Sequence, residues 1–194
     1  MVVFAKEPRP GRVKTRLARG IGTVAAARWF RGTALGVIRG LARDPRWALR
    51  IAVSPDREGM ASRVWPVAVA RQPQGRSDLG ARMARALRSP RPGPVVVIGA
   101  DVPGISPARI AEAFAALGRA DAVFGPAEDG GFWLVGLKRL RAPPAERRMF
   151  EGVRWSRETT LAETLDAFRG LRVAFCAELR DVDEAADLVR VEGR

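Results

Sequence analysis

Short apolar runs alternate along the chain with longer stretches in which apolar residues recur at helical spacing. The runs predict strands at residues 2–5, 47–53, 64–70, 94–100, 122–124, 132–137 and 171–176. The longer stretches predict helices at 23–42, at 79–87, from Ser106-Pro107 onwards, at 156–168 and at 185–191. Because proline cannot donate a ladder hydrogen bond, Pro66 places the 64–70 strand near a sheet edge.

This alternation predicts a single α/β domain over residues 1–194, a three-layer α/β/α arrangement with a Rossmann-like, mostly parallel sheet. The run 95–98 is continuously apolar, which is typical of a central strand covered on both faces. Ligands of such sheets bind beyond the carboxyl ends of the strands. We therefore expect the loops after the strands at 2–5, 94–100 and 122–124 to carry the function.

The composition restricts the chemistry, because the chain has no histidine and no tyrosine. The missing histidine excludes Ser-His-Asp and Cys-His catalysis and His-ligated zinc. Any metal must be held by carboxylates, carbonyls and water, which suit Mg²⁺ or Mn²⁺. The lone Cys176 lies in an apolar stretch and is interpreted as a structural thiol. With no apolar run near the ~20 residues of a membrane span, a cytoplasmic protein is expected.

The formal net charge is +13, carried almost entirely by arginine. A basic chain can bind nucleic acid or another polyanion. The basic residues are scattered along this sequence, however, without a basic tail or a dense cluster. We therefore do not expect nucleic acid as a partner.

A basic loop at residues 6–16 follows the first predicted strand and precedes helical sequence. It contains five basic side chains and Gly11. Main-chain N–H groups at a helix start, with Lys and Arg nearby, match the charge of a nucleotide diphosphate. No Walker motif is present, and a solvated basic loop is the alternative interpretation. Because Lys6 and Lys14 are two of only three lysines among 34 basic residues, we favour phosphate binding.

Two acidic motifs follow predicted strands. In Gly99-Ala-Asp-Val-Pro-Gly104, Asp101 follows the most hydrophobic strand, where a carboxylate can hold a metal over a pocket; an Asx turn is the alternative. In Pro126-Ala-Glu-Asp-Gly-Gly131, adjacent carboxylates can serve as a base beside a flexible glycine pair. An Asp-Gly hairpin turn explains this second motif equally well. Further acids at 181–187 open the last predicted helix, where capping alone accounts for them.

Six motifs in this order resemble one bacterial family: FAKEPRPGRVKTRLA, SDLGARMARAL, GADVPGI, PAEDGGFWLVGL, WSRETTLAETL and DVDEAADL. The family is that of radical-SAM/selenodomain-associated transferases, also called arsenosugar-biosynthesis-type glycosyltransferases. Its members are similar to small nucleotide-diphospho-sugar transferases of the GT-A fold, which also includes guanylyltransferases. The resemblance covers essentially the whole chain and implies the fold more directly than the reaction.

On the donor side, the resemblance implies nucleotide binding by Lys6, Lys14 and Arg16, and the predicted nucleotide-binding set also includes Gly11 of the same loop and Asp78. Asp101 corresponds to the aspartate that binds the metal bridging the diphosphate, and Asp183 to a late acidic position with a second metal contact. Mg²⁺ or Mn²⁺ is the expected cofactor. The family's usual Thr-Pro-Glu after the second aspartate is replaced here by Glu184-Ala-Ala186, a departure beside that contact.

On the acceptor side, the resemblance implies a binding set of Gly130, Gly131, Trp155 and Ser156, to which the motif itself adds Trp133 as an aromatic residue close to Asp129. Asp129 is the predicted base for the acceptor hydroxyl, with Glu128 as its substitute, and the ring of Trp133 is expected to pack against the acceptor. Lys14 is predicted to act in catalysis by stabilising charge on the departing diphosphate.

The sequence thus predicts a metal-dependent glycosyltransferase that uses a nucleoside-diphosphate sugar and a small acceptor. One alternative is a nucleotidyltransferase that joins a nucleoside monophosphate to a phosphorylated small molecule. Arg139 and Arg141 favour this alternative, because they lie a few residues after the motif at 126–131, which we call the acceptor loop. A third hypothesis is a non-catalytic nucleotide- or polyanion-binding protein, without metal dependence or turnover. The donor sugar and base, the acceptor, the stereochemistry and the oligomeric state stay open, a homodimer being compatible with the sequence.

Overall fold

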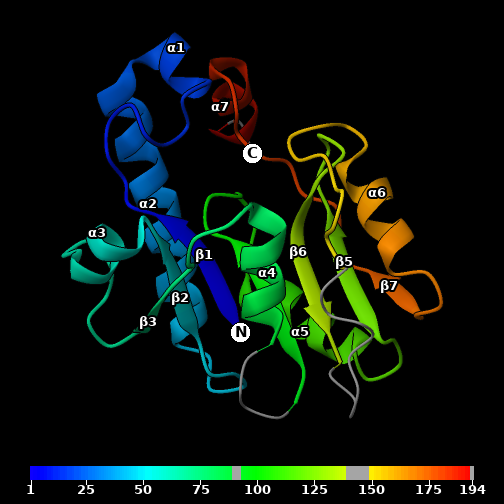
Figure 1. The fold of residues 1–194 in the computed structure, drawn as a ribbon. Coiled ribbons are helices and arrows are strands. Elements are labelled where there is room, and N and C mark those ends of the chain that lie inside the picture. Colours follow the sequence, from blue (N-terminus) through cyan, green and yellow to red (C-terminus); the bar gives the residue numbers. More distant parts are fainter. Residues whose placement is uncertain (89–92, 139–148, 193–194) are drawn as a thin grey trace.

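The computed structural model describes residues 1–88, 93–138 and 149–192. Within them the strands form one seven-stranded sheet in the order β3-β2-β1-β4-β6-β5-β7 (Figure 1). The strands are β1 Val2–Lys6, β2 Arg50–Ser54, β3 Ala70–Pro73, β4 Val95–Gly99, β5 Ala122–Pro126, β6 Phe132–Leu137 and β7 Val173–Phe175. The helices are α1 Leu17–Ile21, α2 Thr23–Ala42, α3 Asp56–Ala61, α4 Leu79–Leu87, α5 Pro107–Ala116, α6 Thr160–Ala167 and α7 Ala185–Glu192.

The sheet is mostly parallel, as the sequence predicts, and β6 is the exception. It pairs antiparallel with β4 on one side and with β5 on the other, whereas the remaining pairs are parallel. The reason is local: β5 and β6 are joined by the short connection at residues 127–131, which can link only antiparallel neighbours. β5 consequently runs in the same direction as β1 and β4.

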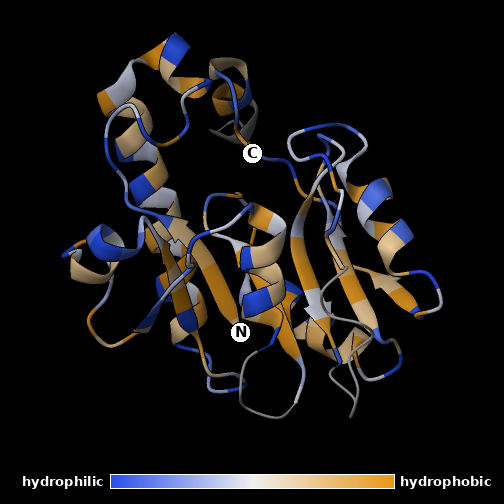
Figure 2. Cartoon of the chain, in the orientation of Figure 1, coloured by the Kyte–Doolittle hydropathy of each residue, from blue (hydrophilic) through white to orange (hydrophobic). Residues whose placement is uncertain are grey.

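Helices cover both faces of the sheet, so the predicted three-layer arrangement is confirmed. α2 and α5 bury one apolar face, around Phe30, Ile38 and Ile110. α4 and α6 lie on the opposite face, where Met83 and Leu87 pack into the second part of the core. The strands between these layers are the most continuously hydrophobic part of the chain (Figure 2). None of the helices that the structure describes is long and apolar enough to cross a membrane.

The carboxyl ends of the parallel strands meet at one edge of the sheet. The loops that follow β1 and β4, the β5–β6 hairpin and the segment after β7 all lie there, at the top of Figure 1 beside α1 and α7. Segments far apart in the sequence are thereby brought to one place, which is the arrangement expected for a ligand site of this fold class.

Two predicted elements differ from the structure. The apolar run 64–70 is not a strand, because the Val69 N–H donates to the carbonyl of Pro66 in a turn. Trp65 is buried in the core, and the edge strand β3 begins only at Ala70. The predicted start of a helix at Ser156 is also wrong, because α6 begins at Thr160 and Ser156 has a left-handed backbone. The short helices α1 and α3 were not predicted, since five or six residues give little periodic signal.

Candidate active site

A cavity of about 800 Å³ opens at the carboxyl edge of the sheet. Its walls come from the loop after β1, the loop after β4, the β5–β6 hairpin, the segment before α6 and the segment before α7. Polar and charged side chains dominate the lining, which consists of Lys6, Lys14, Thr15, Arg16, Asp101, Glu128, Asp129, Gly130, Ser156, Arg157, Glu158, Asp181 and Asp183. Six carboxylates face four basic side chains there, so the cavity is acidic although the whole chain carries +13.

Lys14 and three aspartates form a compact group in this cavity, which we call the charged centre. The Lys14 Nζ lies 2.6 Å from a carboxylate oxygen of Asp181 and 2.9 Å from one of Asp101. Asp183 lies 3.5 Å from the same ammonium, and its other oxygen pairs with Arg16 at 3.1 Å. The Lys14 side chain is only 5% exposed, whereas the three carboxylates are about one-third exposed toward the cavity.

The protonation of the charged centre follows from burial and from these short distances. Burial alone would lower the pKa of the Lys14 ammonium, but the charges of Asp101 and Asp181 outweigh it and hold that pKa above its ordinary value. Burial, together with the neighbouring Asp101 carboxylate, raises the pKa of Asp181 to about 6, against the opposing influence of Lys14. The group is thus a set of crowded carboxylates that depends on one cation for neutralisation.

The local backbone directs Lys14 into the group. Its φ of 44° is left-handed, a conformation that side-chain-bearing residues rarely adopt, and its carbonyl accepts the Ala18 N–H at the start of α1. Leu17, fully buried, anchors the next residues, while the Lys14 ammonium lies 5.8 Å from the ring centre of Trp29. Ser156, also in the cavity lining, has a φ of 59°. Strained residues gather where the surrounding structure serves a function, and both of these line the cavity.

Asp181 and Asp183 reach the cavity because the intervening Val182 is fully buried. In extended chain, alternate side chains point to the same side, so burying Val182 turns both carboxylates toward Lys14. Of the acids at 181–187, the structure gives the hydrogen bonds at the start of α7 to Asp187 and not to Asp183 or Glu184. It is the Asp187 carboxylate that accepts the N–H groups of both residues, which leaves the Asp183 side chain free for the cavity.

The donor atoms of the charged centre fit a divalent cation of the Mg²⁺ or Mn²⁺ type. The carboxylate oxygens converge on a single point of positive charge, the Lys14 ammonium, and no softer ligand lines the cavity. Among the residues that the structure describes, no three acidic or sulfur side chains are already placed as a complete metal cage. Mg²⁺ typically needs only one or two carboxylates, with water and substrate phosphates as the other ligands.

The acceptor loop is both a hairpin turn and a cavity wall. Asp129 Oδ1 accepts the Gly131 N–H at 2.9 Å, and Gly130 has a φ of 81°. A side chain at Gly130 would collide with the backbone of Glu158, so this glycine lets the hairpin lie against the segment before α6. Glu128 is paired with Arg180, whereas Asp129 makes no ion pair among the residues that the structure describes.

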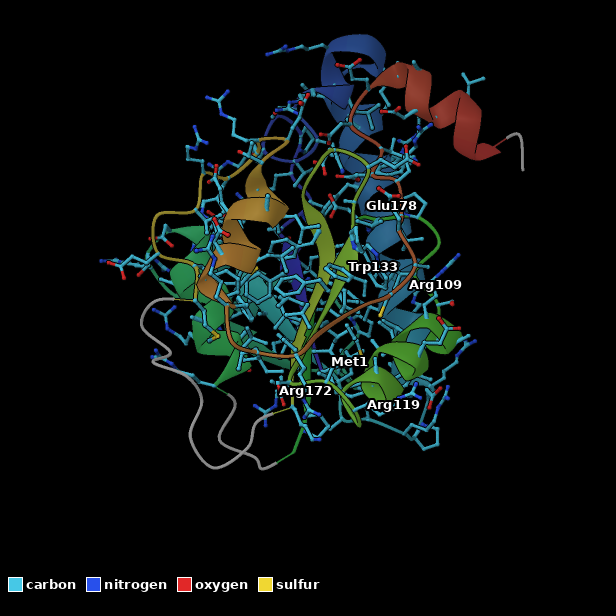
Figure 3. All side chains as sticks on the ribbon, turned by 90° about the vertical axis from the view of Figure 1, so that its right-hand side faces the viewer. Met1, Arg109, Arg119, Trp133, Arg172 and Glu178 are labelled. Atoms are coloured by element: carbon cyan, nitrogen blue, oxygen red, sulfur yellow. The ribbon has the colours of Figure 1, made fainter. Side chains whose placement is uncertain are left out.

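The aromatic side chains near the acceptor loop differ in exposure from the sequence prediction. Trp133 is 2% exposed, and its indole N–H donates to the carbonyl of Ala177, beside the segment that carries Glu178 (Figure 3). It is largely a core residue. The preceding residue, Phe132, points to the opposite face and meets Trp155 with ring centres 6.3 Å apart. Phe132, Trp133 and Trp155 all line a smaller cavity beside this one, so Phe132 joins the two predicted tryptophans there.

Nine of the fourteen predicted site residues line the cavity. Gly131, Trp133 and Trp155 line a smaller cavity beside it, whereas Gly11 and Asp78 line neither. The Asp78 carboxylate accepts the Ala81 N–H at 2.8 Å and caps α4. Gly11 is an exposed loop residue with a φ of 75°. Neither residue enters the function proposed below. Arg139 and Arg141 lie outside the residues that the structure describes.

Sequence reasoning omitted four lining residues from the site: Thr15, Arg157, Glu158 and Asp181. Asp181 could have been found, since Asp-Val-Asp has the two-residue period of an extended segment. Arg157 had no such signal in an arginine-rich chain. Its guanidinium makes no ion pair among the described residues, so it is available to an anion in the cavity.

Comparison with known proteins identifies the family and agrees with the fold. A family model described as "Uncharacterized protein conserved in bacteria (DUF2064)" matches residues 37–157. The chain belongs to this family. It is also similar to a provisionally assigned nucleotide-diphospho-sugar transferase from Desulfovibrio desulfuricans G20, with a TM-score of 0.80 and 30% identity over 94% of this chain and 81% of that one. The fold is therefore of the nucleotide-diphospho-sugar transferase type that the motifs implied, and it indicates a transferase that uses an activated nucleotide.

Two more distant structures share the fold alone. One is 4-diphosphocytidyl-2C-methyl-D-erythritol synthase from Anaerococcus prevotii DSM 20548, with a TM-score of 0.60 and 8% identity over 100% of this chain and 95% of that one. The other is Rv0371c from Mycobacterium tuberculosis H37Rv in complex with manganese, with a TM-score of 0.51 and 21% identity over 100% and 97%. No protein with a curated description matches the chain.

Proposed function

We propose that this DUF2064 member transfers a glycosyl group from a nucleoside-diphosphate sugar to a hydroxyl of a small acceptor. The observation that carries the proposal is the layout of the cavity. The charged centre lies on one side, and Asp129, which has no ion pair within the described part of the chain, lines the same space. The first suits a diphosphate and its cation, and the second suits a hydroxyl that must lose a proton.

On the donor side, Asp101 and Asp183 are the proposed ligands of Mg²⁺ or Mn²⁺, with Asp181 beside them. A divalent cation bound there supplies positive charge to the departing diphosphate. Lys14 would neutralise the aspartates, as in the structure, until they hold that cation, and would then be free to donate to the diphosphate. Arg16 and Lys6 line the cavity beside it and add to the attraction for phosphate.

On the acceptor side, Asp129 accepts the proton of the attacking hydroxyl. The hairpin holds its carboxylate in place through the Gly131 N–H, and the remaining oxygen is available to the acceptor. Glu128 contributes less than the sequence predicts, because its charge is already paired with Arg180.

A nucleotidyl transfer is the second candidate, and Arg157 is the observation that favours it. Arg157 and Lys6 both line the cavity without an ion pair among the described residues, and either could bind an acceptor phosphate. In that reaction the phosphate of the acceptor attacks the α-phosphorus of a nucleoside triphosphate and pyrophosphate leaves. The carboxylate of Asp129, which makes no ion pair among the described residues, repels such an acceptor, and we therefore place this reaction second.

Product analysis distinguishes the two reactions. The protein is incubated with a panel of nucleotide sugars and, separately, of nucleoside triphosphates, each with Mg²⁺ or Mn²⁺ and a set of small alcohols. We expect the protein to release nucleoside diphosphate from a nucleotide sugar. This release should be lost in the Asp101→Asn variant. Pyrophosphate release that depends on Asp101, with no diphosphate from any sugar donor, would assign the chain to the nucleotidyltransferases. Tight nucleotide binding that needs neither metal nor Asp101, with no turnover, would instead support a non-catalytic binding protein.

The finer assignments rest on sequence resemblance. The association with arsenosugar-type biosynthesis, the cytoplasmic location and the oligomeric state stay predictions.

A further inference from the structure

A second cavity of about 200 Å³ adjoins the charged one. We call it the side pocket. Asp129, Ser156 and Asp181 line both cavities, so the two spaces meet at the proposed base. The rest of the side pocket is mainly apolar, with Leu79, Met83, Val102, Phe132 and Trp155 among its walls.

Phe132 and Trp155 form the aromatic wall of the side pocket, and other aromatic rings pack against the side of this wall that faces the core. Trp155 contacts both Phe132 and Phe150, with ring centres 6.3 and 6.0 Å apart, and Phe132 packs edge-on against the buried Phe124. Gly80 lets α4 approach this wall, since a Cβ there would lie 2.5 Å from Phe150. The wall is therefore preorganised and needs no rearrangement to receive a ligand.

Leu79 forms the outer rim of the side pocket. It is the first residue of α4 and is 42% exposed, whereas Met83, one turn further along, is 6% exposed. Isolated exposed leucines are common on protein surfaces and carry no meaning by themselves. Leu79 differs because it lines an apolar pocket that also contains the Asp129 carboxylate, so its exposed side chain can contact a ligand.

We propose that the side pocket binds an apolar group of the acceptor, an aromatic ring or a short alkyl group, while the acceptor hydroxyl lies at Asp129. This inference rests on the proposed function and names the acceptor class: an alcohol with one compact apolar substituent. The volume agrees, because an apolar cavity of about 150 Å³ can hold benzene. The charged donor is excluded from this space, since phosphate cannot be desolvated there without partners.

Two alcohols with the same reacting group probe the side pocket: benzyl alcohol, which carries a ring, and glycerol, which does not. Each is titrated into the protein in the presence of diamagnetic Mg²⁺ and the nucleoside diphosphate that binds best, and the dissociation constant is measured by saturation-transfer NMR. We expect benzyl alcohol to bind at least about 10-fold more tightly than glycerol, because apolar substituents in such pockets give discrimination of this order.

Leu79→Lys places a charge at the rim on an already exposed position, so folding should be retained. It should weaken benzyl alcohol about 10-fold and leave glycerol and nucleotide affinity unchanged. Met60→Lys is the matched control, because Met60 is 43% exposed and lies on α3, outside both cavities. If Leu79→Lys does not fold, Leu79→Ser tests the same rim without a charge. Equal binding of the two alcohols, or equal loss in the Leu79 and Met60 variants, overturns the inference.

The experiment also separates this inference from the proposed function. The nucleotide titration is done first, with and without Mn²⁺. If no nucleotide binds but benzyl alcohol still depends on Leu79, the side pocket is upheld as an apolar subsite and glycosyl transfer fails. If nucleotide and Mn²⁺ bind but benzyl alcohol shows no dependence on Leu79, the donor half stands and the acceptor class proposed here is wrong.

Discussion

The charged centre and the side pocket lie next to each other but are built on opposite principles. In the charged centre, every group is partnered within the protein: one buried ammonium serves three carboxylates. In the side pocket, the walls are packed from behind and present an apolar surface toward the cavity. A ligand must therefore exchange partners in the first region, whereas in the second it has only to displace water.

This difference predicts in which region the energetic effects of two substitutions should depend on each other. Removing one member of an ion cluster changes the energy of all the others, because a buried charge without a partner is costly. An apolar wall contributes by contact area, and its effects should be nearly independent of charges a few residues away. The predictions below test this contrast, beginning with the largest effect.

Asp129, which lines both regions, should give the largest loss of rate. Asp129→Asn is expected to lower kcat by about 100-fold or more, the usual contribution of a general base, while nucleotide affinity with Mn²⁺ stays the same. Initial rates of diphosphate release, together with calorimetric titration, measure the two effects. Glu128→Gln is the matched neighbour: its pair with Arg180 is about half-exposed, so rate and stability should change little. Equal losses in both variants would remove Asp129 from its assigned role.

Asp101→Asn should abolish most of the metal-dependent nucleotide binding. We expect the affinity for nucleoside diphosphate with Mn²⁺ to fall at least about 100-fold, since substitutions that only support a metal ligand already cost about 10- to 100-fold. Asp121→Asn serves as control, because Asp121 is similarly exposed and pairs with Arg172 away from the cavity. Unchanged affinity in Asp101→Asn would contradict the metal assignment.

Lys14→Met should move two affinities in opposite directions. Nucleoside diphosphate should bind about 10-fold more weakly, because a charge-assisted hydrogen bond is lost. Mn²⁺ alone should bind more tightly, since the aspartates lose the cation that neutralises them. Titration of Mn²⁺ by electron paramagnetic resonance, without nucleotide, measures the second effect. Lys6 also lines the cavity but makes no ion pair with any described residue, so Lys6→Met should leave Mn²⁺ binding unchanged. Weaker Mn²⁺ binding in Lys14→Met would show that the ammonium does not compete with the metal.

A pair of double-mutant cycles tests the contrast itself and should show the smallest effects. Lys14→Met leaves crowded carboxylates behind, so Asp181→Asn in that background should recover part of the lost stability, with a coupling of about 0.5–3 kcal/mol. Lys14→Met combined with Leu79→Ala should be additive within about 0.5 kcal/mol, because the two residues belong to different regions. Urea unfolding of the single and double variants provides the free energies. Additivity in the first cycle would mean that the charged centre is not a coupled unit.

Much of this protein could be predicted from the sequence, because the signal lies in local pattern. The apolar run before Asp101 predicted a buried central strand, and the helix at 23–42 and the strand at 132–137 agree with α2 and β6. The strand–loop order placed Lys14, Asp101 and Asp129 at strand ends, which meet at one edge in any mostly parallel sheet. The absence of histidine limited the metal ligands to oxygen.

Only the tertiary structure decided how these groups pair. Lys14 lies among Asp101, Asp181 and Asp183, and these contacts connect residues separated by up to 169 positions. Contacts of this kind leave no periodic signal in a single sequence. The same holds for Glu128, whose charge is paired with Arg180, 52 positions away. It also holds for Phe132, which contacts Trp155 because the neighbouring Trp133 side chain is buried on the opposite face of the sheet. Local pattern determines which residues reach the edge of the sheet, whereas burial and long-range charge pairing determine which of them remain available to a ligand.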